Sequence, residues 1–338
     1  MENQNLLKSK LTDFRNFLYI TWKHLKLPEP TPIQYSIANF LANGDTRSII
    51  SAYRGCGKSW ITSAYVLWRL LLDPQINILV VSASKSRADD FSTFCLRLLQ
   101  EMPILEHLYP KDTQRQSKIS FDVAPAGASH QPSVKSMGIT SQLTGSRADL
   151  IIADDVETSG NTQTQLMRDK LSESIKEFEA IIKPEKSRIV FLGTPQVEQS
   201  IYNKLQERGY KVRFWTARYP TENQLKSYGS SLAPVIGNTW THERIGDPVD
   251  PVRFNNEDLL EREASYGRLS FNMQFMLDTT LNDLNKYPLK LSDLTVMTLN
   301  PDNAPEKVIW ASSPELKQEG LPCVGLQGDS YYRPMQVQ

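Results

Sequence analysis

The pattern of apolar and polar residues predicts helices in the N-terminal part of the chain. Residues 8–25 (KSKLTDFRNFLYITWKHL) and 33–44 (IQYSIANFLANG) repeat apolar side chains at helical spacing. The second pattern stops at Gly44, and glycine is common where helices end. Two further helices are expected over 59–73 (SWITSAYVLWRLLLD), which is strongly apolar, and over 91–99 (FSTFCLRLL).

Short apolar runs between these helices predict buried strands. The runs are 47–52 (RSIISA), 77–84 (NILVVSAS), 149–155 (DLIIADD) and 187–195 (SRIVFLGTP). A continuous apolar run bounded by polar residues is typical of a parallel strand that is buried on both faces. Because strands and helices alternate, we expect an α/β fold with a mainly parallel sheet flanked by helices.

The pattern changes in the C-terminal third of the chain. The stretch 227–240 (SYGSSLAPVIGNTW) resembles a loop, 257–278 is helical in pattern, and the Pro-rich tail has weak periodicity. We therefore predict three parts. They are an α/β core with an N-terminal helical segment over 1–245, a small helical lid over 246–290, and a linker over 291–338.

Composition narrows the class of protein. Lys and Arg together number 38, as do Asp and Glu, so any contact with DNA has to be local rather than the work of a global basic field. The three cysteines form no CxxC pair, which favours a reducing cytoplasm. There is no signal-peptide pattern and no apolar run of ~18 residues, so we expect a soluble intracellular protein without a membrane partner.

Residues 51–59 (SAYRGCGKS) nearly match the phosphate loop G-x-x-x-x-G-K-[ST], with Ala52 in place of the first glycine. Ala52 costs little if its backbone angles stay in the ordinary allowed region. The loop follows a predicted strand and precedes a predicted helix, as a phosphate loop does. We expect ATP to bind to Ala52, Tyr53, Arg54, Gly55, Cys56, Gly57, Lys58 and Ser59.

The acidic end of the run LIIADD supplies candidate catalytic groups. Asp154 ends a predicted strand, where open α/β sheets place ligand sites, and is the predicted Mg²⁺ carboxylate together with the Ser59 hydroxyl. Asp155 and Glu157 are alternative general bases for the attacking water. Asp155 is adjacent but has a short side chain, and Glu157 lies two residues further on, so both stay open.

Two further polar residues flank these motifs. Thr194 ends the strand SRIVFLGTP, where a hydroxyl can sense the γ-phosphate of ATP. Gln34, in PTPIQ, precedes the first strand, and its amide has the donor and acceptor needed to recognise adenine. The alternative for Gln34 is a solvated residue at a helix start.

Together these motifs resemble the ATPase part of the large terminase subunit of short-tailed, double-stranded DNA bacteriophages. The resemblance spans roughly residues 28–285 and rests on SAYRGCGKS, VVSASKSRADDFSTF, TGSRADLIIADDVE, FLGTP and FNNEDLLEREASYGRLSFNMQFMLD. It implies a P-loop NTPase of RecA-like (ASCE) fold, with ATP and Mg²⁺ as its cofactors. It also implies a homo-oligomeric ring, pentameric when active, that works with the portal protein of a procapsid and a small terminase subunit. Such a ring packages double-stranded DNA in the host cytoplasm.

The resemblance also implies roles for two arginines. Arg54, inside the phosphate loop, acts in cis, and an always-charged guanidinium there stabilises the charge that develops on the γ-phosphate. Arg147, shortly before the acidic strand, is the candidate for a finger that acts in trans on a neighbouring subunit. The alternatives are an arginine that points to solvent for Arg54 and an ordinary exposed charge for Arg147.

Other classes of protein fit less well. A helicase of RecA-like type normally has a second α/β domain, and no second set of alternating strands and helices follows residue 245. A non-hydrolysing scaffold is disfavoured because Lys58, Ser59 and Asp154 are all present. Large terminases usually continue into a nuclease domain. The chain ends about where that domain would begin, and Asp329 lacks a following strand, so we expect no nuclease activity from it.

Overall fold

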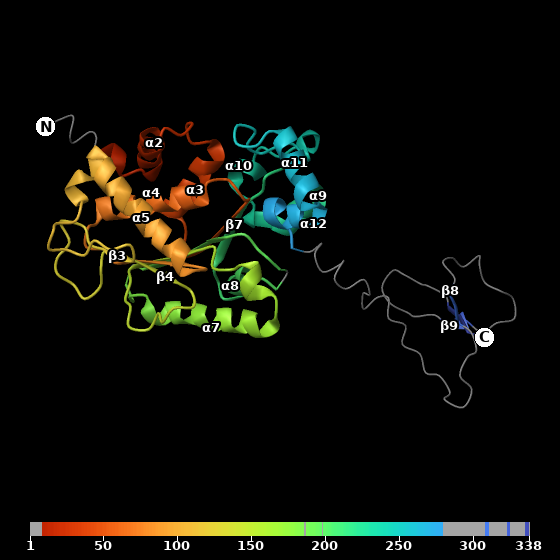
Figure 1. The fold of residues 1–338 in the computed structure, drawn as a ribbon. Coiled ribbons are helices and arrows are strands. Elements are labelled where there is room, and N and C mark those ends of the chain that lie inside the picture. Colours follow the sequence, from red (N-terminus) through yellow and green to blue (C-terminus); the bar gives the residue numbers. More distant parts are fainter. Residues whose placement is uncertain are drawn as a thin grey trace, which may run out of the picture. The chain divides into compact units, whose positions relative to one another are not determined.

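The computed structural model describes residues 9–185, 187–197 and 199–279, and the backbone of three short strands beyond them. Residues 1–282 form one compact unit and residues 283–338 a second. No helix among the described residues is long and apolar enough to cross a membrane. Figure 1 shows the first unit as a sheet with helices on both faces.

Seven strands form one sheet in the first unit, in the order β3-β4-β2-β5-β6-β1-β7. The four predicted strands are present as β1 (Arg47–Ala52), β2 (Ile78–Ser82), β5 (Leu150–Asp154) and β6 (Arg188–Gly193). Their mutual pairings, β2 with β5, β5 with β6 and β6 with β1, are all parallel. The predicted α/β class is therefore confirmed, and the carboxyl ends of β1, β5 and β6 meet at one edge of the sheet.

Three strands of this sheet were not predicted: β3 (Ser120–Phe121), β4 (Val134–Gly138) and β7 (Lys211–Trp215). They lie at or next to the sheet's two edges, and β3 pairs antiparallel with β4. In β4, buried residues alternate with partly exposed ones, and β7 begins with an exposed lysine. Partial exposure permits polar residues, so neither sequence forms the continuous apolar run that marks a central parallel strand.

Helices cover both faces of this sheet (Figure 1). On one face lie the predicted helices α2 (Phe14–His24), α3 (Pro32–Asn43), α4 (Lys58–Leu72) and α5 (Lys85–Glu101). The shorter segments on the way to β5 and β6 are the 3₁₀ helix η1 (Pro103–Leu108) and helix α6 (Ser159–Thr162). The opposite face carries α7 (Gln165–Ile181) and α8 (Ile201–Glu207). The apolar core is divided accordingly into two clusters, one on each face.

The part after β7 is mainly helical. It contains α9 (Glu222–Tyr228), η2 (Gly229–Ser231), α10 (Pro234–Gly237), η3 (His242–Arg244), α11 (Asn256–Tyr266), α12 (Arg268–Phe271) and the π-helix η4 (Asn272–Met276). The stretch 227–240, interpreted as loop, thus includes short helical turns. Residues 246–279 belong to the same compact unit as the core, so a separate lid over 246–290 stays a prediction.

The second unit contains a small antiparallel sheet. Its strands β8 (Val308–Trp310), β9 (Cys323–Val324) and β10 (Met335–Val337) lie in the order β8-β10-β9. The weak periodicity of 291–338 did not predict these strands. The rest of the predicted linker, including Asp329, lies outside the described residues.

Candidate functional site

The phosphate loop connects β1 to α4 at the carboxyl edge of the sheet. Gly55 and Gly57 have φ angles of 89° and 94°, in the left-handed region that favours glycine. Gly57 is the N-cap of α4, so the start of that helix adjoins the loop. Ala52 pairs with Trp215 as an ordinary strand residue, which explains why no glycine is needed there. The loop borders a pocket of about 460 Å³.

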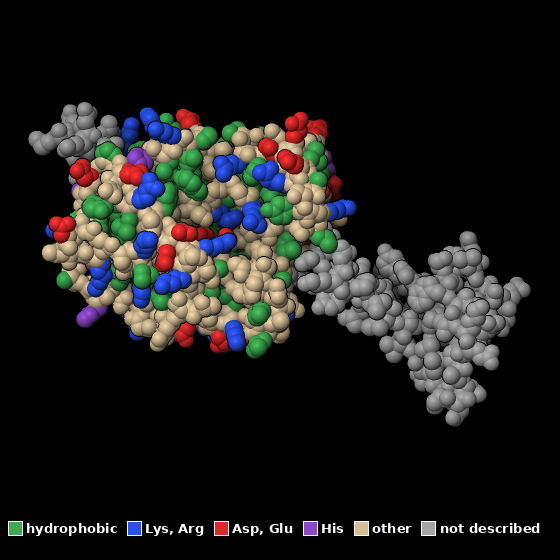
Figure 2. Space-filling view, viewed as in Figure 1, with side chains coloured by type: hydrophobic (Ala, Val, Ile, Leu, Met, Phe, Trp, Pro, Cys, Tyr) green, Lys and Arg blue, Asp and Glu red, His purple; other side chains and the backbone are tan. Residues whose placement is uncertain are grey.

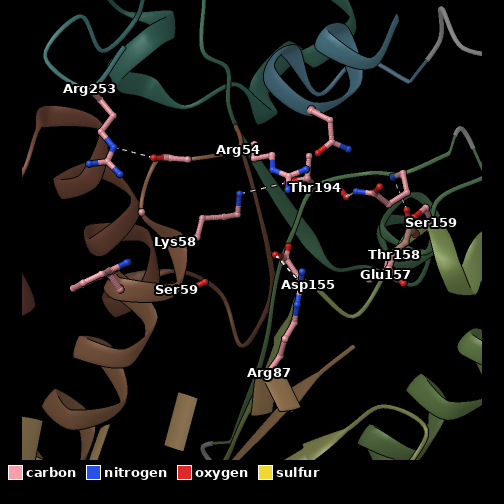
Figure 3. A pocket seen from close by; sticks show the side chains of 15 residues that line it. Arg54, Lys58, Ser59, Arg87, Asp155, Glu157, Thr158, Ser159, Thr194 and Arg253 are labelled. Atoms are coloured by element: carbon pink, nitrogen blue, oxygen red, sulfur yellow. Dashed lines mark hydrogen bonds and ion pairs between the residues drawn. The ribbon is translucent and has the colours of Figure 1, made fainter. Parts of the chain in front are cut away.

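Lys58 crosses the loop toward this pocket (Figure 3). Its Nζ donates to the backbone oxygens of Ala52 at 2.6 Å and Tyr53 at 3.3 Å, and to Thr194 Oγ1 at 3.4 Å. Within the described ranges Lys58 makes no ion pair with a carboxylate. The ammonium is therefore held in place by neutral oxygens and is available to pair with an anionic ligand.

Asp154 ends β5 beside Ser59. Its Oδ2 accepts a hydrogen bond from Ser59 Oγ at 3.4 Å, whereas its Oδ1 is buried without a hydrogen-bond partner among the described residues. Burial, and then the charge of Asp155, raise the pKa of the Asp154 carboxyl to about 7. A buried carboxylate oxygen without a partner, next to a hydroxyl, fits Mg²⁺, which takes oxygen ligands and keeps several waters.

Asp155 lies at the pocket, in the turn that follows β5. Its φ angle of 47° is uncommon for a residue other than glycine, and its N–H donates to the Leu192 oxygen at 2.8 Å. The side chain is 38% exposed, and its Oδ2 lies 3.8 Å from Arg87 Nη1. An accessible carboxylate therefore reaches the pocket directly after Asp154.

Glu157 borders the same pocket but is buried, and both of its oxygens are occupied. Oε1 accepts from the N–H of Gln196 at 2.7 Å, and Oε2 accepts from Ser200 Oγ at 2.8 Å and the N–H of Ile201 at 2.7 Å. Burial raises the pKa of this carboxyl, while the same hydrogen bonds lower it. Glu157 thus joins the loop after β5 to the start of α8.

Thr194 follows β6 and borders the pocket, where the sequence predicted a γ-phosphate sensor. Its Oγ1 lies between Lys58 Nζ and the Ala52 oxygen. Gln196, which the sequence did not single out, also borders the pocket and donates from Nε2 to the Thr194 oxygen at 3.0 Å. The hydroxyl is thus in contact with the lysine of the phosphate loop.

Gln34 is buried and braces the phosphate loop. Its Oε1 accepts from the Thr31 N–H at 3.1 Å, as part of the capping box of α3, and its Nε2 donates to the Cys56 oxygen at 2.9 Å. The solvated alternative for Gln34 is therefore wrong. A smaller pocket of about 130 Å³ adjoins Gln34 and Gly57.

Residues within the predicted lid contact the phosphate loop. The Arg54 N–H donates to the Gln274 oxygen at 3.0 Å, and the exposed Arg54 guanidinium lies 6.0 Å from the centroid of the Tyr266 ring. Arg253 Nε donates to the Gly55 oxygen at 2.9 Å and its side chain borders the pocket, as Figure 3 shows. The C-terminal helical part and the phosphate loop are therefore directly linked.

Asp250, in the segment before α11, also contacts the phosphate loop. Asp250 is buried and its Oδ2 accepts hydrogen bonds from Thr31 Oγ1 at 2.6 Å and from the Tyr53 hydroxyl at 3.3 Å. Burial raises the pKa of the Tyr53 hydroxyl well above its usual range, so it stays a donor. Tyr53 is thereby anchored to a segment distant in sequence.

Comparison with known proteins decides the family. The family described as "Terminase large subunit, T4likevirus-type, N-terminal" matches residues 49–182. The large terminase subunit of Enterobacteria phage T3 is 49% identical over 327 residues, which is 95% of this chain and 56% of that protein. The chain belongs to the large terminase family. It spans about half the length of this relative.

Two solved terminase structures are similar to this chain. The ATPase domain of the large terminase of Thermus phage P74-26 is 15% identical, with a TM-score of 0.43, and the match covers 77% of this chain and 97% of that chain. The HK97 bacteriophage large terminase is 13% identical, with a TM-score of 0.42, and the match covers 74% and 50% respectively. The α/β fold of this chain is established by the strand pairing in its own sheet.

Arg147 of the terminase chain does not border its own phosphate pocket. It precedes β5, whose other end carries Asp154, and its exposed side chain donates from Nη1 to the Ser146 oxygen at 2.8 Å. A strand rises ~3.3 Å per residue, so the length of β5 separates Arg147 from the site of its own subunit. Action in trans stays a prediction.

Sequence reasoning did not single out seven of the residues that line the pocket of this terminase. Trp60, Thr158 and Ser159 adjoin the predicted motifs, whereas Arg87, Gln196, Arg253 and Gln274 come from four other segments. Arg87 and Gln274 lie within two of the stretches that carry the family resemblance, but no local pattern assigned either of them a role. Arg87 was the most accessible to prediction, because it follows the end of a predicted strand next to the one that carries Asp154.

Proposed function

We propose that this chain hydrolyses ATP at the phosphate-loop pocket, and that hydrolysis drives double-stranded DNA through a portal into a procapsid. The observation that carries the proposal is the meeting of Lys58, Ser59, Asp154 and Asp155 at the carboxyl edge of a parallel sheet. The family relationship supports the packaging role, since the relative is a large terminase subunit.

Each group at the site has a chemical task in this proposal. Water attacks the γ-phosphorus, the bond to the β–γ bridging oxygen breaks, and a carboxylate accepts the proton of the water. Lys58 binds the β- and γ-phosphate oxygens, and Thr194 contacts the γ-phosphate. Ser59 and Asp154 would hold Mg²⁺, which would supply positive charge to the phosphate oxygens when bound.

Asp155 is the general base in our proposal. Its carboxylate is accessible at the pocket, whereas Glu157 has both oxygens occupied by three donors. A base has to come within hydrogen-bond reach of the water and have a free lone pair toward it. Glu157 instead positions the loop that carries Gln196, next to Thr194.

Two further roles complete the site. Arg54 acts in cis on the phosphates, which requires its guanidinium to leave the Tyr266 ring. Gln34 recognises adenine in this proposal. Its Nε2 has a second N–H beyond the one donated to Cys56, and its Oε1 has a second lone pair beyond the one that accepts from Thr31. The small pocket beside Gln34 supports this second assignment.

The partners follow from the family rather than from the site. We propose that the active form is a homo-oligomeric ring, pentameric on the portal, which works with a small terminase subunit in the host cytoplasm. Arg147 contributes in trans within that ring. We also propose that residues 1–338 have no nuclease activity of their own.

Phosphate release from ATP tests the enzymatic part of this proposal. The wild-type chain should release phosphate with Mg²⁺, and Lys58→Ala should abolish release because the β- and γ-phosphates lose their main cation. Lys226→Ala, an exposed lysine on α9, is the matched control and should be as active as wild type. Normal turnover in Lys58→Ala would refute the site assignment.

A further inference from the structure

Arg87 is a cation that lines the phosphate pocket but has no role in the hydrolysis proposed for this site. It lies in the first turn of α5, where its N–H donates to the capping Ser84 hydroxyl at 3.4 Å. Helix α5 begins directly after β2, and the last residue of β2, Ser82, is paired with Asp154. The helix start therefore holds Arg87 at the same edge of the sheet as the catalytic carboxylates.

The ion-pair partner of Arg87 is Asp155 (Figure 3). The shortest distance between guanidinium and carboxylate is 3.8 Å, which is longer than a hydrogen bond, and the side chains are 57% and 38% exposed. Exposed ion pairs of this kind contribute little to stability. A more highly charged anion can therefore replace Asp155 at little cost.

The other cations at the pocket are engaged differently. Lys58 is held by backbone oxygens, Arg253 by the Gly55 oxygen, and Arg54 lies over an aromatic ring. Among the cations that line the pocket in the described part of the chain, Arg87 alone is paired with a carboxylate. That carboxylate is the residue proposed as the base.

We infer that Arg87 is a second arginine acting in cis, which exchanges Asp155 for the γ-phosphate when ATP binds. This inference rests on the proposed ATPase function. Lys58 and Thr194 line the same pocket as Arg87 and Asp155, so a γ-phosphate bound by the first two lies in the space that Arg87 faces. A planar, always-charged guanidinium can donate two parallel hydrogen bonds to phosphate oxygens. At 3.8 Å from Asp155, Arg87 donates none to that carboxylate.

The exchange has two consequences for the reaction. Arg87 neutralises charge on the γ-phosphate as the bond to the bridging oxygen breaks. At the same moment Asp155 loses its cationic partner and is free to accept the proton of the attacking water. When ADP and phosphate leave, Arg87 returns to Asp155, so the base is paired whenever there is no γ-phosphate.

Binding of nucleotides to Arg87→Ala tests this inference. We expect the affinity for ADP to stay at the wild-type value and the affinity for a non-hydrolysable ATP analogue to fall ~10-fold. We expect kcat to fall ~10²-fold or more. Arg87→Lys should lie between, because a point charge replaces the planar fork. Arg15→Ala is the matched control, since Arg15 is an exposed arginine in the first turn of another helix, α2, pairs with the Asp13 carboxylate, and does not line the phosphate pocket.

The outcomes separate this inference from the ATPase proposal. An unchanged ratio of analogue affinity to ADP affinity in Arg87→Ala overturns the γ-phosphate contact, even if kcat falls. If Arg87→Ala does not fold, as checked by thermal unfolding, the same ratio in Arg87→Lys decides. Failure of the ATPase proposal would give a different result: the wild type would release no phosphate, or Lys58→Ala would remain active.

Discussion

Asp155 and Glu157 are only two residues apart, yet their carboxylates have different surroundings. Asp155 is accessible and loosely paired with Arg87, whereas Glu157 is buried and accepts three hydrogen bonds. At the residue scale, this contrast is our reason for proposing Asp155 as the general base and Glu157 as a positioning residue. The sequence alone left the two open, because spacing along a turn does not determine which side chain is buried.

The two amide variants should therefore fail in different ways. Asp155→Asn removes the base, so hydrolysis should fall ~10²-fold or more while ATP still binds and the melting temperature is unchanged. Glu157→Gln points an amide N–H₂ at groups that are themselves donors, which should cost ~1–3 kcal/mol of stability. Phosphate release and thermal unfolding of both variants check this. A stable Glu157→Gln with the larger loss of rate would contradict the assignment.

Asp154 predicts a pH dependence of stability without Mg²⁺. Its pKa is about 7 in the folded chain, against ~3.9 for an unperturbed Asp, so the folded state binds the proton more tightly. The cost of burying the charge is absent below the unfolded pKa, grows as pH rises, and is complete above the folded pKa. Asp154→Asn should therefore melt higher than wild type at pH 8, and the gain should shrink toward pH 5.

Thermal unfolding across that pH range, in buffer with a chelator, makes this measurement. Added Mg²⁺ and ATP should reverse the order of the two melting temperatures, because only the wild type keeps the carboxylate that binds the metal. A gain in melting temperature that is the same at both pH values would show that Asp154 does not carry a buried charge.

Some residues of the site were predictable and others were not, for a physical reason. Lys58, Ser59, Asp154 and Thr194 lie at the ends of predicted strands or within a loop of fixed spacing, so their types and positions are visible in the sequence. Arg253 reaches the site from a segment distant in the chain. Tertiary packing alone brings it there, and no local pattern records that packing.

At the scale of elements, the phosphate loop is held from two directions. Gln34 on α3 donates to the Cys56 oxygen, and the segment before α11 supplies the Arg253 contact to Gly55. A Cβ atom on Gly55 would lie 2.7 Å from Phe254 Cζ. The conformation of the loop therefore depends on contacts with the segment before α11.

Gly55→Ala tests this contact. The substitution places a methyl group against Phe254 and a side chain on a backbone with a φ angle of 89°, so ATP affinity should fall ~10-fold or more, with some loss of stability. Gly237→Ala is the control, since an added Cβ there meets its nearest atom at 3.9 Å, an ordinary contact. Equal nucleotide affinities for the two variants would contradict the role of the contact.

The strands show the same limit of prediction at the element scale. The central strands β1, β2, β5 and β6 are buried throughout most of their length, so their apolar runs predicted them. Strand β7 has partly exposed residues among its five, and its sequence lacks that run. The order of strands in the sheet could not be predicted, because pairing is set by contacts between distant segments.

At the scale of the whole molecule, the charges are mixed. Figure 2 shows basic and acidic side chains interspersed over the viewed face, as expected from equal numbers of both. No face-wide basic field marks a DNA-binding surface in that view. Arg147 precedes β5, and Asp154 lies at the other end of that strand. The proposed catalytic role of Arg147 therefore requires a neighbouring subunit in the ring.

Mixing two inactive variants tests the role of Arg147. Arg147→Ala and Asp155→Asn should each hydrolyse ATP poorly, with losses of ~10³-fold for a missing finger. A subunit without its base still lends its arginine to a neighbour with an intact base, so the mixture should regain activity. No rescue at any ratio of the two would assign Arg147 a structural role.

The most direct measurement is an experimental structure of the chain with Mg²⁺ and a non-hydrolysable ATP analogue. The account predicts the β- and γ-phosphates at Lys58, the metal at Ser59 and Asp154, and the Asp155 carboxylate facing the water in line with the γ-phosphorus. A nucleotide bound away from the phosphate loop, or a metal that does not contact Asp154, would contradict it.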